Sequence, residues 1–233
     1  MSFLRTPTPL RPPRYDMYVG IHKGLRAFMC ETLARLGRVD TDDEADLSET
    51  LDGVELLLSF CSGHLEHENT VIHPAMEARQ PGATEAAEKE HGEHAVSISI
   101  LVAQVAEVRA TQSCARVRAA LRLYRMLALF VGESFVHMHQ EETEHNDCLW
   151  SHYSDAELLA IETRIHALLS PAEMSLALRW MVPAMSPAER LALLGPLAVS
   201  LPPTVFEALL GELRPHLSGA DCAKLEHGLR QAA

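Results

Sequence analysis

Apolar residues recur every three or four positions over most of the chain, which is the spacing of one face of an α-helix. Short polar, proline- or glycine-containing stretches interrupt this pattern. The pattern predicts four long helices, over about 15–36, 47–80, 84–110 and 114–150. Because short turns join them, we expect an all-α fold in which these helices form an up-down-up-down antiparallel four-helix bundle.

The expected helix ends follow from local chemistry. The acidic segment 40–46 suits a helix N-terminus, and Ser113 is placed to cap the fourth helix. Pro74 should bend the second helix near its end, and Pro81 with Gly82 should close it. On the fourth helix the positions expected to face inward are Val117, Leu121, Tyr124, Leu127, Val131 and Ser134.

Both ends of the chain differ from this central part. Residues 1–14 hold four prolines, which predicts an extended arm. Residues 151–233 divide into short helices, and two capping boxes with proline at the first helical position start at Ser170 and Ser186. We therefore expect a bundle over 15–150 and a helical appendage whose apolar faces pack on the bundle, on a second copy of the chain in a homodimer, or on another protein partner.

Composition narrows the class of protein. The chain has 20 basic and 32 acidic residues and a net charge of −12, without a basic stripe, so neither nucleic acid nor an anionic membrane is an expected partner. Five cysteines without a CxxC pair indicate neither a disulfide framework nor a thiolate zinc site. There is no apolar run of signal or membrane-spanning length, and we expect a cytoplasmic protein.

Histidine is the unusual residue: the chain has 13. His64 with Glu68 and His137 with Glu141 are pairs four residues apart, which on a helix rise about 6 Å and turn only about 40°, so each forms a chelating pair on one face. His22 on the first helix, and His91 and His94 on the third, also lie on inward stripes. Measured from the turns, these histidines fall within about two helical turns of one level.

So many buried imidazoles and carboxylates would cost several kcal/mol per ionised group without a counter-ion, which favours a bound metal. Mixed nitrogen and oxygen donors suit iron or manganese better than a metal that prefers thiolates.

The ordered set His22, His64, Glu68, His91, His137 and Glu141 resembles the hemerythrin-like (HHE) cation-binding domain over about residues 15–150. That family carries a histidine, an HxxxE pair, a histidine and a second HxxxE pair on successive helices. The resemblance implies a di-iron centre, with or without an oxo or hydroxo bridge, that binds or senses O2, NO or iron level rather than acting as an enzyme.

Several alternatives stay open. His91, His94 or both could be the third-helix ligand, and His145, four residues after Glu141, could add one. We expect His67, His73 and His139 at the rim or surface. A non-haem di-iron enzyme acting on peroxide or O2 would need the same centre. A ferritin-like, carboxylate-bridged site has some support in the ExxH pairs Glu88–His91 and Glu142–His145, although these fall on the wrong helices for that class.

Overall fold

The structure, a computed structural model, describes residues 14–112 and 114–232. Its regular elements are all helical, and no strand occurs in this part of the chain, so the predicted all-α class is confirmed. In chain order they are α1 (Val19–Gly37), α2 (Glu44–His67), η1 (Glu68–Ile72), α3 (His73–Arg79), α4 (Glu85–Ala110), α5 (Cys114–Gln140), η2 (Glu141–His145), α6 (Asn146–His152), α7 (Asp155–His166), α8 (Pro171–Ala184), α9 (Pro187–Ser200), α10 (Pro203–Leu213), η3 (Arg214–His216) and α11 (Gly219–Ala232). Among the described helices none is long and apolar enough to cross a membrane.

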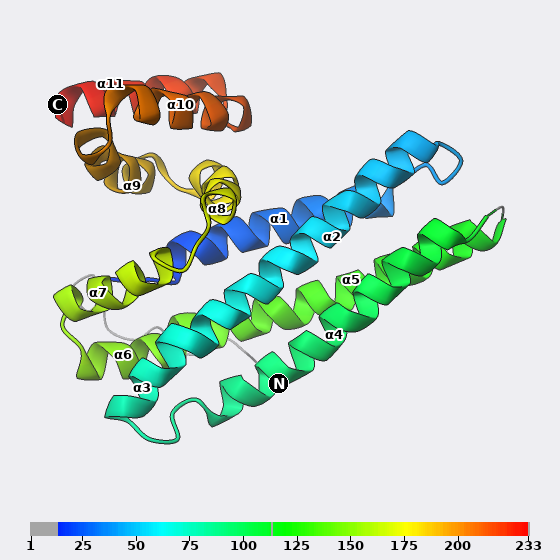
Figure 1. The fold of residues 1–233 in the computed structure, drawn as a ribbon, viewed down its shortest axis with the longest axis horizontal. Helices are drawn as coiled ribbons and strands as arrows, with labels where there is room; N and C mark the ends of the chain where they lie inside the picture. The colour runs from blue at the N-terminus through cyan, green and yellow to red at the C-terminus, as the bar shows by residue number, and fades with distance from the viewer. Residues whose placement is uncertain (1–13, 113, 233) are drawn as a thin grey trace.

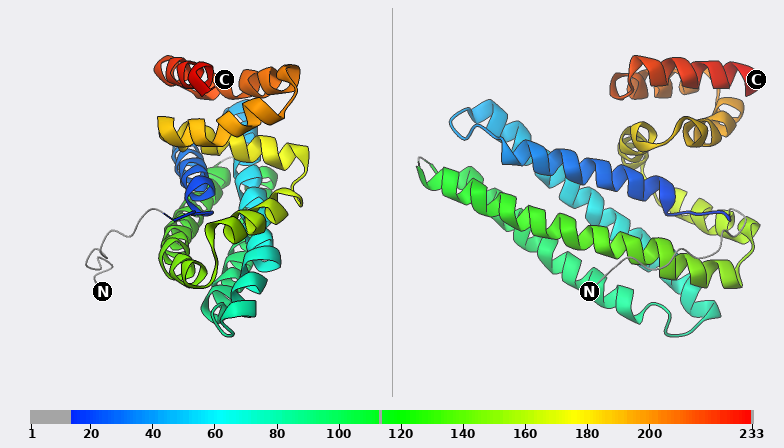
Figure 2. Two further views of the ribbon diagram at one scale, coloured as in Figure 1. Left: turned by 90° about the vertical axis from the view of Figure 1, so that its left-hand side faces the viewer. Right: turned by 180° about the vertical axis from the view of Figure 1, so that it is seen from behind.

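The four longest helices lie side by side (Figures 1 and 2). α1 packs against α2 and α5, and α4 packs against the same two helices. Leucines and valines from all four helices fill the space between them, and Leu51, Leu57, Val105 and Leu127 are completely buried. This apolar core reaches as far as Leu65 and Met138, the neighbours of His64 and His137 in sequence.

The expected inward stripe of α5 is partly wrong. Leu127, Val131 and Ser134 are buried, as predicted. Val117 and Leu121, however, are 52% and 47% exposed, and Ala120 and Leu123 are buried in their place. Leucines occur on two faces of this helix, so apolar spacing alone could not choose between them. The buried face is the one that carries Ala119 and Ala120, whose small side chains let a neighbouring helix approach closely.

The helix boundaries follow local hydrogen bonding. α1 begins at Val19 rather than near Tyr15, because the Asp16 carboxylate accepts hydrogen bonds from the backbone N–H groups of Tyr18 and Val19. Gly82, after α3, has a φ of 84°, the left-handed region that favours glycine. Residues 1–13 of the arm expected at 1–14, and the Ser113 cap, lie outside the described residues.

Two segments are π-helical rather than α-helical. η1 follows α2 without a break and continues into α3, and η2 links α5 to α6 in the same way. Each π-helix starts at a glutamate of a predicted chelating pair, Glu68 or Glu141. Single π-helical turns inside longer helices occur frequently at functional sites.

The C-terminal segment packs on the long helices through α8, which crosses α1 (Figure 1). Trp180 of α8 stacks on Phe28 of α1 with ring centroids 4.1 Å apart. Both predicted capping boxes are present at the starts of α8 and α9. α8 to α11 also share a small core of their own, which includes Val182, Leu194 and Leu210. The expected boundary at residue 150 falls within α6.

Gly24 permits the close approach of α1 to α8. A Cβ atom at Gly24 would lie 3.0 Å from the backbone nitrogen of Met181, so Gly24→Ala should force α8 away from α1 and destabilise the protein by about 1–3 kcal/mol. Gly53 in α2 is the matched control, because an added Cβ there meets no atom within 4 Å. Gly53→Ala should stabilise the protein by about 0.5–1 kcal/mol. Urea unfolding measures both; equal shifts in the same direction would contradict the assigned role of Gly24.

Candidate metal centre

A cluster of histidine and glutamate side chains lies between the four longest helices. α1 supplies His22, and the junction of α2 with η1 supplies His64 and Glu68. α4 supplies His91, and the junction of α5 with η2 supplies His137 and Glu141. All six predicted residues of the ordered set therefore meet in one place.

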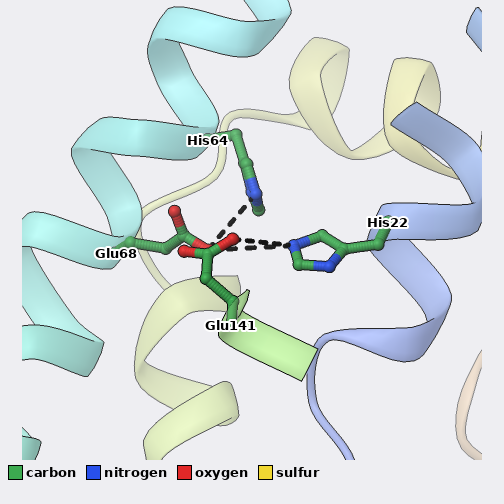
Figure 3. Close-up of side chains that lie close together, drawn as sticks. All are labelled: His22, His64, Glu68 and Glu141. Carbon is green, nitrogen blue, oxygen red and sulfur yellow. Dashed lines mark ion pairs between the residues drawn. The ribbon is translucent and has the colours of Figure 1, made fainter. Parts of the chain in front are cut away.

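One donor set consists of His22, His64, Glu68 and Glu141, whose ligand atoms lie within 4.8 Å of one another (Figure 3). His64 Nε2 is 3.2 Å from Glu68 Oε1, and His22 Nε2 is 3.5 Å from Glu141 Oε2. Donors this close, converging from three helical segments, are suited to a single cation.

A second donor set consists of Glu68, His91, His137 and Glu141, and all four residues are buried. His91 Nε2 is 3.6 Å from Glu68 Oε2, and His137 Nε2 is 3.3 Å from Glu141 Oε1. The two imidazole Nε2 atoms are 3.0 Å apart. Each carboxylate thus turns one oxygen toward the first set and the other oxygen toward the second, which is the arrangement of bridging carboxylates.

Several buried atoms of the cluster have no hydrogen-bond partner in the described structure. They are His22 Nε2, His64 Nε2 and all four carboxylate oxygens of Glu68 and Glu141. Leaving such groups unsatisfied costs about 1–3 kcal/mol each, and more for charged groups. A bound cation would satisfy these atoms together, so the residues present fit a metal.

Three of the four histidines are held by a hydrogen bond on the other ring nitrogen. Nδ1 of His22 is 3.1 Å from Glu142 Oε1, and Nδ1 of His91 is 2.7 Å from Asn69 Oδ1. Nδ1 of His137 is 2.8 Å from Glu90 Oε2. Since these partners are acceptors, each Nδ1 carries the proton and donates it, and the lone pair of Nε2 faces the cluster.

Sequence reasoning missed these orienting residues. Asn69 and Glu142 directly follow the two glutamates of the chelating pairs, and Glu90 directly precedes His91. Their only signal in the sequence is that they are next to candidate ligands. Polar residues occur beside many helical positions, so this signal could not single them out. Arg26 holds Glu142 in turn, donating to both of its oxygens.

The two central carboxylates have opposite pKa shifts. Burial and the neighbouring charge of Glu141 raise the pKa of Glu68 well above its usual range. Burial opposes ionisation of Glu141 as well, but the imidazoles of His137 and His91 hold its pKa well below the usual range. Burial also lowers the pKa of His64 to about 3. In the absence of a cation, the cluster therefore keeps neutral His64 available as a ligand.

His94, also a predicted ligand, is buried but belongs to neither donor set. Its ring lies edge-on to Phe130 and His137, with centroid distances of 5.8 and 5.0 Å. Three residues after His91, it is turned about 60° away on the helix, which separates the two rings. The structure therefore places His91, and not His94, among the candidate ligands.

The expectation for His73 is wrong, since it is buried with 2% exposure and lies beside the cluster. Together with Glu141 and His145 it forms a third group of donors within 4.8 Å of one another. His139 is exposed and His67 partly exposed, as expected.

The carboxylates that would support a ferritin-like site are elsewhere. Glu88 is exposed and accepts a hydrogen bond from Thr84, while Glu142 binds Arg26 and the outer nitrogen of His22. No protein-family model, curated protein or solved structure matches this chain. The case for a function therefore rests on the geometry of the cluster.

Removing one imidazole from either donor set should weaken metal binding. We expect His64→Ala and His137→Ala to lower the affinity for a divalent metal at least about tenfold, because losing even a residue that only orients a ligand costs about that much. The exposed His139→Ala is the control and should bind metal as the wild type does. Metal per chain after equilibration against a weak chelator measures the effect. Equal metal content in all three variants would show that the cluster is not the metal site.

Metal-free protein should lose stability in acid. Burial lowers the pKa of His64 to about 3 and, with neighbouring histidines, the pKa of His73 and His94 to about 4. For His137 the carboxylates of Glu141 and Glu90 outweigh burial and raise the pKa. Below about pH 6.5 the unfolded chain takes up these protons while the folded chain does not, so stability present above pH 6.5 falls toward pH 4.

Melting curves of chelator-treated protein between pH 4.5 and 8 test this expectation. His94→Leu removes one of these imidazoles without removing a member of a donor set, so its melting temperature should fall less steeply with acid. Parallel curves for the two proteins would contradict the assignment of His94 as a neutral buried group.

Proposed function

We propose that this protein is an iron-binding protein of the hemerythrin-like kind, holding two iron ions and binding or sensing a small molecule such as O2. NO and iron level are the alternative signals. In this proposal α1, α2, α4 and α5 form an up-down-up-down antiparallel bundle around the centre. The observation that carries it is the division of the oxygens of Glu68 and Glu141 between two donor sets.

The donor chemistry supports iron as the metal. Each set offers two imidazole nitrogens and two carboxylate oxygens, with no thiolate in any candidate group of the described residues. Such mixed donors suit iron and manganese, and two imidazole nitrogens with two carboxylate oxygens would leave further coordination positions of either metal free. When bound, iron supplies reversible redox and ligand-binding chemistry at these positions.

A small cavity adjoins the donor sets. It has a volume of about 20 Å³ and is lined by His64, His94 and His137 together with apolar side chains such as Leu25, Met29 and Phe130. Since a single water needs at least about 10–15 Å³, this space suits a molecule of one or two heavy atoms and no organic substrate. Its apolar wall keeps bulk water away from the bound molecule.

A groove between α4 and α5 offers a route to the cavity. Leu129, Gly132 and Val136 contribute to its wall, and His94 and His137 line both the groove and the cavity. A small molecule passing from solvent to the centre would pass these two rings. In this proposal His94, which belongs to no donor set, controls access rather than binding metal.

The cavity also admits hydrogen peroxide, so peroxide reduction is the second candidate function. Both functions need the same residues, and turnover separates them.

The test uses full-length protein produced with ample iron. We expect about two iron ions per chain and a visible absorption spectrum that dithionite abolishes and oxygen restores. His64→Ala protein serves as the control and should show a much weaker spectrum. Rapid consumption of many equivalents of hydrogen peroxide would favour the enzyme instead. Near-zero iron, with manganese also absent, would overturn the proposal.

A further inference from the structure

The third group of donors contains His73, Glu141 and His145, and the position of His73 depends on the π-helix η1. In an α-helix, a residue five positions after Glu68 would be turned about 140° away from it. A π-helix closes with i→i+5 hydrogen bonds and so brings residues five apart onto one face. η1 covers Glu68–Ile72 and therefore directs His73 inward. His145, at the end of η2, is four residues after Glu141 and would lie on the same face in an α-helix as well.

His73 has the features of a ligand without a partner. It is 2% exposed, and neither of its ring nitrogens has a hydrogen-bond partner in the described structure. A buried histidine that serves only packing normally has at least one nitrogen satisfied. Its ring lies 5.7 Å from that of His145, edge to face.

His145 is oriented in the same manner as the ligands of the two donor sets. It is 7% exposed, and its Nδ1 lies 3.3 Å from the hydroxyl of the buried Tyr18. With Nδ1–H donating to that hydroxyl, Nε2 is left with a free lone pair. Glu141, whose oxygens have no hydrogen-bond partner in the described structure, completes the group.

This group is a position separate from the other two. Donors to one ion must lie close together. A ligand atom of His73 lies within 4.8 Å of ligand atoms of Glu141 and His145, and His73 belongs to neither four-residue set. Two imidazoles and one carboxylate with open positions suit divalent first-row metals such as Fe²⁺, Mn²⁺ or Co²⁺.

We propose that His73, Glu141 and His145 form a third cation position, which holds a divalent metal more weakly than the two four-residue sets. Three protein ligands instead of four account for the weaker binding. This inference rests on the proposed function only through Glu141, which all three groups share.

The experiment is an anaerobic titration of chelator-stripped, full-length protein with Co²⁺, followed by absorption and calorimetry. Wild-type protein should take up three equivalents, the third at least about tenfold more weakly. The double variant His73→Ala/His145→Ala should take up two, with affinities within about threefold of the wild-type pair. The control double variant His139→Ala/His152→Ala removes two exposed histidines and should still take up three.

Other outcomes overturn the inference. Uptake of two equivalents by both wild-type and double variant, or of three by both, would show that no ion is held by His73 and His145. A loss of one of only two equivalents would make these histidines ligands of the pair itself. Wild-type protein that takes up none would overturn the proposed function as well. If circular dichroism shows that the double variant is unfolded, the single variants His73→Asn and His145→Asn replace it.

Discussion

Two carboxylates buried against each other are the constraint on which the rest of the site depends. Glu68 and Glu141 are each 1% exposed, and two ionised carboxylates buried side by side without a cation are strongly unfavourable. Imidazoles from α1, α2, α4 and α5 surround the pair, and in the proposed function cations neutralise it. At this level electrostatic interactions would hold the four long helices together, and elsewhere along them the packing of leucine and valine side chains does so.

The π-helices influence which further histidines lie in the cluster. Each begins at one of the two carboxylates and changes the phase of the residues after it. On a continuous α-helix His73, five residues after Glu68, would be turned away from that carboxylate. The i→i+5 hydrogen bonding of η1 brings His73 to the same face. With His145, four residues after Glu141, the candidate ligands number eight rather than six.

The C-terminal segment contributes to the centre indirectly. It supplies no residue to the donor sets of the described structure, yet α8 packs across α1, the helix that carries His22. Phe28 against Trp180 holds α8 on α1, and an ion pair between Lys23 and Glu189 joins α1 to the first turn of α9. The position of α1, and with it His22, therefore depends on a segment whose own sequence carries no sign of metal chemistry.

Helical spacing by itself determined the all-α class, the two capping boxes and the meeting of the six residues of the ordered set, because each depends on residues a few positions apart on a regular helix. The hemerythrin-like resemblance stays a prediction. Only the tertiary structure decided which apolar face of α5 is buried, that α8 packs on α1, that His94 lies outside the donor sets and that His73 lies inside the protein. These outcomes depend on contacts between distant segments and on a local change of hydrogen-bond register. The spacing of residues along the chain reveals neither the distant contacts nor the change of register.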